Sequence, residues 1–307
     1  MNVVLVGEES AGLQVLRALR GSRHRLVAVL AAAPPADFTG FSVWNVARNL
    51  GCETWPASLV KTADLAGRLR QYDVDILLNV HSLYRIHREV LAAPKLGAFN
   101  LHQGLLPRYA GLNTVSWAIF RGETTHGVTI HKMDADLDTG PVVYQSSFAI
   151  ELDDTALSLS FKCVREGVAL MLRLLEAAER GIDNIPLTPQ NPTLREFFGS
   201  EVPEHGRLCW SWPAAKVVNF VRACDYSPFT SPWGHPRSCL GAQEFALVKA
   251  SWTGLPSNAE AGTVGDSTNS GVYVACQDEW ILATKLRVDN KYLPAGEFLK
   301  PGDHLAG

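Results

Sequence analysis

The sequence predicts an α/β protein in which a Rossmann-like, mostly parallel sheet forms the N-terminal domain and a small β-barrel forms the C-terminal domain. Through the first 183 residues, short apolar runs alternate with segments of helical periodicity, the pattern of parallel strands and their crossover helices. A polar, proline-rich stretch follows at 184–203, and short strand-like runs then come close together, as in a small barrel. The length of 307 residues fits two domains.

In the N-terminal domain, the apolar run 3–6 ends at Gly7, and apolar residues then recur at helical spacing over 13–19. The run 75–80 is expected to be a buried strand. Asp153 and Asp154 are suited to cap a long helix that Gly181 ends. The expected strands are 3–6, 26–30, 53–55, 75–80, 95–102, 126–133 and 142–150, and the expected helices lie at about 13–19, 43–50, 65–71, 117–121 and 153–180.

The domain boundary is expected in the proline-rich stretch, which gives a catalytic domain at 1–183, a linker at 184–204 and a C-terminal domain at 205–307. Within the C-terminal domain, 210–223 is expected to be a strand end followed by a helix. The expected strands beyond it are 245–248, 271–276, 280–283 and 285–288.

The composition argues against several classes of protein. A net charge of −3 gives no general positive field for nucleic acid. The six cysteines include no Cys-x-x-Cys pair, so neither a zinc site nor a redox motif is indicated. The start of the chain lacks the pattern of a signal peptide, and no stretch reaches the roughly 18 apolar residues of a membrane span. We therefore expect a soluble, cytoplasmic protein with reduced thiols and no membrane partner.

Three polar side chains are expected to meet at the carboxyl edge of the sheet. Asn100 and His102 end the strand 95–102, and because side chains two residues apart in a strand point the same way, both face one side. The carboxyl ends of strands in open α/β sheets are where ligands bind. Asp138 belongs to an acidic loop, 134–138, that leads into the next strand and can approach the same spot.

These residue types suit acyl transfer to an amine. His102 can take the proton that the attacking amine loses, a role typically worth about 10²–10⁴ in rate. Asn100 can donate an N–H to the oxyanion, worth roughly 10²–10³, and Asp138 can orient His102 and stabilise its charged form. On chemistry alone an alternative stays open, in which Asn100 and His102 only cap the strand end and 134–138 is a solvated turn or a weak cation site.

The stretch 99–140 contains a series of motifs in a recognisable order and spacing: Phe99-Asn100-Leu101-His102, Leu105-Leu106-Pro107-Arg108-Tyr109, Gly111, Trp117-Ala118-Ile119, Gly122-Glu123, Gly127-Val128-Thr129 and Leu137-Asp138-Thr139-Gly140. On these motifs the stretch resembles the formyltransferase family, which includes methionyl-tRNA formyltransferase, the formyltransferase half of the aminoarabinose lipid A enzyme and glycinamide ribonucleotide formyltransferase. Similarity extends to 4–7, to 75–78 and to 206–223, which resembles the start of the family's appended, OB-like C-terminal domain.

The resemblance implies a one-carbon transferase that uses 10-formyltetrahydrofolate as co-substrate, needs no metal and takes its catalytic groups from Asn100, His102 and Asp138. The implied folate-binding residues are Ser82, Leu83, Tyr84 and Ile86 in one loop, and Asp134, Asp136 and Leu137 in the second wall. The expected acceptor-binding residues are Glu8, Glu9, Gln103, Gly111 and Asn113.

Three departures from the family pattern lie near the implied site. Gly104 stands where the family often has Ser, Ala110 stands where it often has Arg, and Ser82-Leu83 replaces the Tyr-Gly pair of the tRNA enzymes. The catalytic residues are unaffected, so these changes concern the identity of the acceptor.

Weaker signals favour ordinary structural roles. The segment 7–12 lacks the middle glycine of a dinucleotide loop and carries two glutamates, which are better suited to a cationic amine. The histidines 81, 87, 126 and 131 lack metal-ligand spacing and are expected on the surface or in turns. The C-terminal tryptophans at 210, 212, 233, 252 and 280 are expected in the core or at domain contacts rather than as a base-stacking surface.

The sequence therefore predicts an N-formyltransferase acting on a primary amine or hydroxylamine of a small molecule, such as an amino sugar or a specialised metabolite. Methionyl-tRNA formyltransferase is the main alternative, and we disfavour it because 31–43, where the tRNA enzymes carry a basic insertion, has no Lys or Arg. A catalytically silent nucleic-acid-binding protein and a folate hydrolase that releases formate are further alternatives. The sequence names neither the acceptor nor the oligomeric state.

Overall fold

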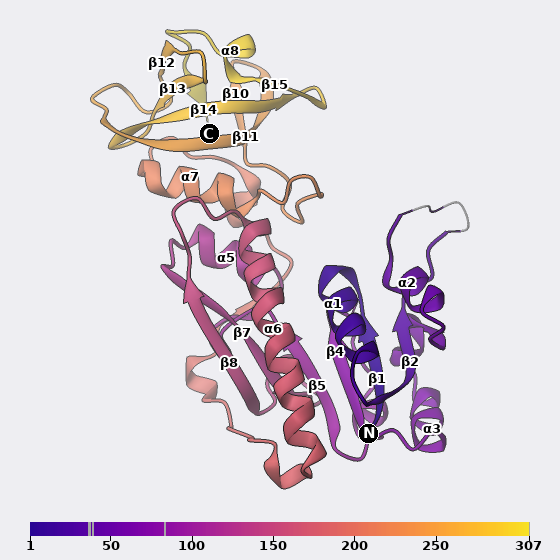
Figure 1. The fold of residues 1–307 in the computed structure, drawn as a ribbon. Helices are drawn as coiled ribbons and strands as arrows, with labels where there is room; N and C mark the ends of the chain where they lie inside the picture. The colour runs from indigo at the N-terminus through magenta and orange to yellow at the C-terminus, as the bar shows by residue number, and fades with distance from the viewer. Residues whose placement is uncertain (36–37, 39, 83, 307) are drawn as a thin grey trace. The chain divides into compact units, whose positions relative to one another are not determined.

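The computed structural model describes residues 1–35, 38, 40–82 and 84–306. The chain folds as two compact units (Figure 1). Unit 1 comprises Met1–Gly111, Gly127–Phe148 and Phe161–Phe197, and unit 2 comprises Leu112–His126, Ala149–Ser160 and Phe198–Gly307.

Unit 1 is built on a seven-stranded sheet, as traced through the described residues, with the order β3-β2-β1-β4-β5-β7-β8. The first five strands in this order are parallel, and β7 runs antiparallel to β5. The prediction of a mostly parallel, Rossmann-like sheet is confirmed. The strands are β1 (Asn2–Gly7), β2 (Arg25–Ala31), β3 (Thr54–Pro56), β4 (Ile76–Val80), β5 (Gly97–His102), β7 (Thr125–Lys132) and β8 (Val142–Ala149).

Helices pack on the sheet because its central strands, such as β1 and β4, are apolar on both faces, whereas most of the edge strand β8 alternates between half-buried and exposed residues. The long helix, drawn in rose in Figure 1, packs against β5, where Gly167 leaves room for the Leu101 side chain, and Ser146 of β8 donates to its Glu166. A core cluster joins β1, β2 and β4 to the helix after β3. The helices are α1 (Glu9–Arg20), α2 (Val43–Asn49), η1 (Ala57–Lys61), α3 (Asp64–Gln71), α4 (Arg88–Leu91), α6 (Ala156–Glu179), η2 (Ile182–Asn184) and η3 (Pro192–Leu194).

The order of the strands creates a switch point between β1 and β4. From β1 the chain adds β2 and β3 on one side, and then returns to add β4 and β5 on the other. Ligands of open α/β sheets bind beyond the carboxyl ends of the strands at such a point. Glu8 and Glu9 follow β1, His81 follows β4, and His102 ends β5, so the candidate residues from these strands lie along that edge.

Unit 2 contains an antiparallel sheet in the order β12-β13-β14-β11-β10-β16, with β15 paired to β14. A backbone hydrogen bond from the Leu305 N–H to the Gly262 carbonyl, and a bridge between Thr263 and His304, join the two ends of this order, so the sheet closes into a small barrel as predicted. The strands are β10 (Arg237–Leu240), β11 (Gln243–Pro256), β12 (Val264–Ser267), β13 (Val272–Ala275), β14 (Glu279–Val288), β15 (Lys291–Pro294) and β16 (Leu305–Ala306).

Unit 2 also contains α5 and α7, which pack on each other, while α7 contacts β11. Its aromatic core includes Trp117, stacked on Phe198 with ring centroids 5.0 Å apart, and Trp210, whose Nε1 donates to Ser238. The helices of unit 2 are α5 (Thr114–Phe120), η4 (Pro203–Gly206), α7 (Ala214–Ala223) and α8 (Ala295–Phe298). The short strand β6 (Ala110–Gly111), which belongs to unit 1, pairs with β9 (Phe197–Phe198).

The barrel strands were predicted too short. The expected strands 280–283 and 285–288 are one strand, β14, and the expected strand 245–248 is part of the 14-residue β11. Register shifts near Lys249 keep these two long strands paired where the apolar alternation breaks, and such bulges have no clear local signal. Of the helices that the structure describes, none is long and apolar enough to cross a bilayer, and the six cysteines are free thiols.

Candidate active site

The structure brings Asn100, His102 and Asp138 together at the carboxyl edge of the sheet in unit 1. Asn100 and His102 lie on β5, and the Asp138 carboxylate approaches from the loop between β7 and β8, with Oδ2 3.7 Å from His102 Nδ1. His102 and Asp138 are buried. Asp138 has φ of +56°, a left-handed conformation that costs a non-glycine residue energy and that often marks functional sites.

His102 is oriented by a backbone carbonyl rather than by Asp138. Its Nε2 lies 2.5 Å from the Tyr109 carbonyl oxygen, which can only accept a hydrogen bond, so Nε2 carries the ring hydrogen. Nδ1 is then free to accept a proton on the side that faces Asp138. A separation of 3.7 Å is too long for a hydrogen bond. Asp138 therefore acts on His102 through its charge, and Tyr109 fixes the tautomer.

The electrostatics of the site favour a neutral imidazole beside a charged carboxylate. Burial lowers the pKa of His102, and the negative charge of Asp138 opposes that shift only in part. Burial alone would raise the pKa of Asp138, but His102, His131 and the N–H of Gly111 hold it well below its usual range. A neutral histidine can accept a proton, and the adjacent carboxylate stabilises the cation that forms.

The pH dependence of turnover follows from these shifts. Because the pKa of His102 is lowered from its ordinary value of 6.5, turnover should fall on the acid side only below pH 6.5. Asp138→Asn removes the charge that raises the His102 pKa, so the acid limb should move to still lower pH while kcat drops at least about tenfold. A pH–rate profile of both proteins measures this shift. Movement of the limb to higher pH would contradict the assignment.

Two residues that the sequence did not reveal complete the polar cluster. Asn79 of β4 donates through Nδ2 to Asn100 Oδ1 at 2.8 Å, and Asn100 Nδ2 lies 3.1 Å from His131 Nε2. His131 Nε2 is also 3.4 Å from Asp138 Oδ1. The expectation that His126 and His131 lie on the surface or in turns is wrong, because both are buried on β7. His126 lies on the same strand face as Val128 and Ile130, which was an available signal for its burial, whereas His131 lies on the opposite face and no such pattern marked it.

The departure at Gly104 has a steric reason. A Cβ at this position would clash with the Tyr109 carbonyl oxygen and would lie 2.8 Å from His102 Nε2. Glycine therefore lets the turn 104–109 bring the Tyr109 carbonyl onto the histidine. Thr129 supports the same turn, because its hydroxyl donates to the Gly104 carbonyl and accepts from the Leu106 N–H.

Gly104→Ala is expected to displace the Tyr109 carbonyl and to lower kcat by about tenfold, less than the 10²–10⁴ expected for loss of a general base, because His102 itself remains. The neighbour is backbone and cannot rotate away, unlike the end of a flexible side chain. The matched control is Gly67→Ala, because a Cβ at Gly67 on α3 meets nothing within 4 Å. Steady-state kinetics compares the two, and equal kcat in both variants would contradict the role of this turn.

The two expected folate-binding segments lie side by side. Arg85 donates to the Ala135 carbonyl and lies 3.9 Å from the Asp136 carboxylate, which ties the loop after β4 to the acidic loop 134–138. Ser82 Oγ bonds to the backbone of Tyr84, Ile86 is buried, and Asp134 accepts from Thr139 and from the Asp136 N–H. Leu137 is exposed, and Leu83 lies outside the described residues.

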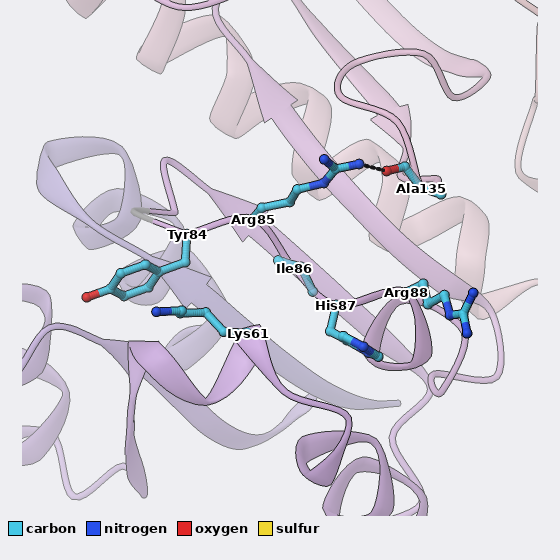
Figure 2. Close-up of a pocket in the computed structure, with 7 residues that line it drawn as sticks. All are labelled: Lys61, Tyr84, Arg85, Ile86, His87, Arg88 and Ala135. Atoms are coloured by element: carbon cyan, nitrogen blue, oxygen red, sulfur yellow. Dashed lines mark hydrogen bonds between the residues drawn. The ribbon is translucent and has the colours of Figure 1, made fainter.

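A hollow of about 520 Å³ opens between these segments (Figure 2). Lys61 stands over the Tyr84 ring, 5.3 Å from its centroid, and Arg85 crosses toward Ala135. Lysine and arginine side chains dominate the charge of the hollow, and its described lining contains no carboxylate. The lining residues are Lys61, Tyr84, Arg85, Ile86, His87, Arg88 and Ala135.

The expected acceptor-side residues differ in what they contact. The Glu8 carboxylate accepts from the Ala32 N–H, whereas Glu9 lies 3.0 Å from His81 Nδ1, which lowers the pKa of Glu9. Gly111 donates its N–H to Asp138 Oδ2 at 2.9 Å. Gln103 follows His102 directly and is half-buried. Asn113 belongs to unit 2, where it precedes α5 with φ of +53°.

The chain is a transferase with an α/β domain and an appended antiparallel barrel domain. The family model described as formyl transferase matches residues 1–175, and the model described as formyl transferase, C-terminal domain, matches residues 202–301. The chain belongs to the formyltransferase family.

Relatives of this chain include enzymes with different acceptors. A methionyl-tRNA formyltransferase of Brucella anthropi is 33% identical, over 98% of this chain and 97% of that protein. The N-formyltransferase of Helicobacter canadensis, solved with folinic acid and dTDP-3-aminofucose, is 18% identical with a TM-score of 0.70, over 92% of this chain and 98% of that one. HypX of Aquifex aeolicus, solved with tetrahydrofolic acid, is 20% identical with a TM-score of 0.65, over 96% of this chain but 46% of that one.

Proposed function

We propose that this protein transfers the formyl group of 10-formyltetrahydrofolate to a primary amine or hydroxylamine of a small molecule, such as an amino sugar or a specialised metabolite. The observation that carries this proposal is the convergence of Asn100, His102 and Asp138 around one point in unit 1, where His102 is buried and held as a neutral base. Family membership supplies the reaction class.

The arrangement supports direct transfer. The amine nitrogen attacks the formyl carbon and forms the new C–N bond, and His102 Nδ1 takes the proton that the nitrogen loses. Asn100 Nδ2 donates to the carbonyl oxygen as it gains negative charge. The bond from the formyl carbon to N10 of the donor then breaks, and the proton passes to N10, which leaves tetrahydrofolate and the N-formyl product. Asp138 stabilises the cationic His102 between these steps.

The hollow beside the loop after β4 fits a folate donor. Its wall joins the two segments expected to hold the pterin, and its cations, Lys61, Arg85 and Arg88, complement the carboxylates of the donor's glutamate end. Two solved relatives contain folates, folinic acid in the Helicobacter enzyme and tetrahydrofolic acid in HypX. We propose that Ser82, Leu83, Tyr84, Ile86, Asp134, Asp136 and Leu137 line the donor site.

Lys61→Gln and Arg88→Gln should each raise the KM of the donor about two- to fivefold and leave kcat unchanged, because exposed charge pairs are worth about 0.2–1 kcal/mol. The effect should shrink as salt is added. Lys249→Gln, on the exposed side of β11 in unit 2, is the matched control and should leave the KM of the donor unchanged. Steady-state kinetics with varied donor checks this, and equal KM values in all three variants would contradict the donor site.

Methionyl-tRNA formyltransferase is the second candidate, favoured by the 33% identity over nearly the whole of the Brucella enzyme. The absence of Lys and Arg from 31–43 favours the small acceptor, because binding to tRNA phosphates needs positively charged side chains. On either acceptor the same three catalytic groups would act.

A transfer screen separates the candidates. Purified protein and 10-formyltetrahydrofolate are offered amino sugars, amino acids, hydroxylamines and charged initiator tRNA, and products are identified by a mass gain of one formyl group for one hydrogen. Transfer to a small amine supports the first proposal, and transfer to tRNA alone supports the second. Formate without a formylated product would indicate a hydrolase, and no turnover of the donor would indicate a silent binding protein.

A further inference from the structure

We propose that Asn79 is a positioning residue that holds the Asn100 amide with its nitrogen toward the reacting carbonyl. This inference rests on the proposed function, in which Asn100 stabilises the oxyanion. Asn79 and Asn100 are register partners on the neighbouring parallel strands β4 and β5, and Asn79 Nδ2 donates to Asn100 Oδ1 at 2.8 Å. Asn79 is 7% exposed, so water competes little for this hydrogen bond.

The contacts of His131, on the other side of Asn100, indicate which of the two asparagines donates in this hydrogen bond. His131 Nδ1 lies 3.0 Å from the Lys132 carbonyl oxygen, which can only accept, so Nδ1 carries a ring hydrogen. With that hydrogen on Nδ1, His131 Nε2 can accept from Asn100 Nδ2 at 3.1 Å, a closer contact than its 3.4 Å separation from Asp138 Oδ1. Asn100 presents its nitrogen to His131 and its oxygen to β4, so a donor is required at position 79.

Asn79 is an unusual residue for its strand. Every residue of β4 is buried, and its other members, Ile76, Leu77, Leu78 and Val80, are aliphatic. Asn79 Oδ1 is buried and has no hydrogen-bond partner in the described chain. A buried polar atom without a partner destabilises the fold, and an aliphatic side chain would avoid this cost. The contact that offsets this cost is the one with Asn100.

The orientation of Asn100 matters for the reaction because its two ends have opposite effects. Asn100 Nδ2 has two hydrogens; His131 takes one, and the other is available to the oxyanion. If the amide rotated by half a turn, Oδ1 would face the oxyanion and repel it. Asn79 prevents this rotation by stabilising only one of the two orientations.

A double-mutant cycle with Asn79→Asp, Asn79→Leu and Asn100→Ala tests the positioning role. The carboxylate introduced by Asn79→Asp would accept from Asn100 Nδ2 and favour the rotated Asn100 amide, so we expect kcat to fall about ten- to hundredfold. Asn79→Leu removes the donor but fits the apolar strand, and it should lower kcat about tenfold. KM for both substrates should change less than about threefold. When Asn100→Ala is already present, either substitution at position 79 should lower kcat by less than about a further twofold, because the Asn100 amide that Asn79 contacts is absent.

A pH series adds a readout that a purely structural role would not move. Protonation lets the side chain of Asn79→Asp donate to Asn100 Oδ1 again, so its kcat relative to wild type at the same pH should rise as pH falls. Asn79→Leu adds no titratable group beside His102, His131 and Asp138, so its kcat relative to wild type should not rise as pH falls, and it is the control for this series. Thermal unfolding of each variant, with Asn219→Leu as a buried asparagine of unit 2 for comparison, measures any loss of fold.

The outcomes separate the two proposals. If the kcat losses of the single variants multiply in the double variant, or if a position-79 variant has a changed KM and a normal kcat, the positioning role of Asn79 is overturned while the proposed function stands. Full turnover in Asn100→Ala would remove the proposed catalytic role of Asn100, and the role of Asn79 with it.

Discussion

Replacing His102 with alanine should leave the protein folded and lower turnover by at least about a hundredfold, within the 10²–10⁴ range of general acid–base catalysis. The reason is geometric: Nε2 is committed to the Tyr109 carbonyl, and Nδ1 is the basic atom that faces Asp138. Single-turnover measurements at saturating donor and acceptor report the chemical step directly.

Two further variants sharpen this test. His102→Asn keeps an N–H that can reach toward the Tyr109 carbonyl but cannot act as a base, so it should be as slow as the alanine variant while restoring stability. His304→Ala, a partly exposed histidine of unit 2, should have normal turnover. A well-folded His102→Asn protein with near-normal turnover would show that another group moves the proton.

The second large effect is expected for Asn100→Asp, which should lower kcat at least about 10²–10³-fold. The change removes the amide donor and places a carboxylate where negative charge develops, so the transition state loses a hydrogen bond and gains a repulsion. The carboxylate of this variant keeps an acceptor for Asn79, and the fold of β5 should persist because its backbone ladder with β4 and β7 is unchanged.

Ground-state binding distinguishes this effect from a misplaced substrate. The dissociation constant of the donor, measured by calorimetry without acceptor, should change less than about threefold, because the oxyanion forms only during transfer. Asn219→Asp in unit 2 is the matched control. A loss of donor affinity as large as the loss of kcat would assign Asn100 to binding rather than to catalysis.

Much of unit 1 was predictable because its signals are local. Each strand from 3–6 to 142–150 has its own apolar run, and the two-residue spacing of Asn100 and His102 is enough to place both side chains on one face at one strand end. The acidic loop was expected to approach that end, and Asp138 does so. The strand boundaries of the barrel were harder to predict, because register shifts between long strands such as β11 and β14 interrupt the alternation of apolar and polar residues that marks a strand.

The sequence by itself determined the α/β order, the family and the three residues proposed for catalysis, since periodicity and motif spacing are written along the chain. Only the tertiary structure decided that Asn79 and His131 share a hydrogen-bonded cluster with Asn100, and that the Tyr109 carbonyl rather than Asp138 orients His102. These contacts depend on the register between neighbouring strands and on how closely the turn at Gly104 approaches β5. Both are set by packing between segments distant in sequence, which no local pattern records.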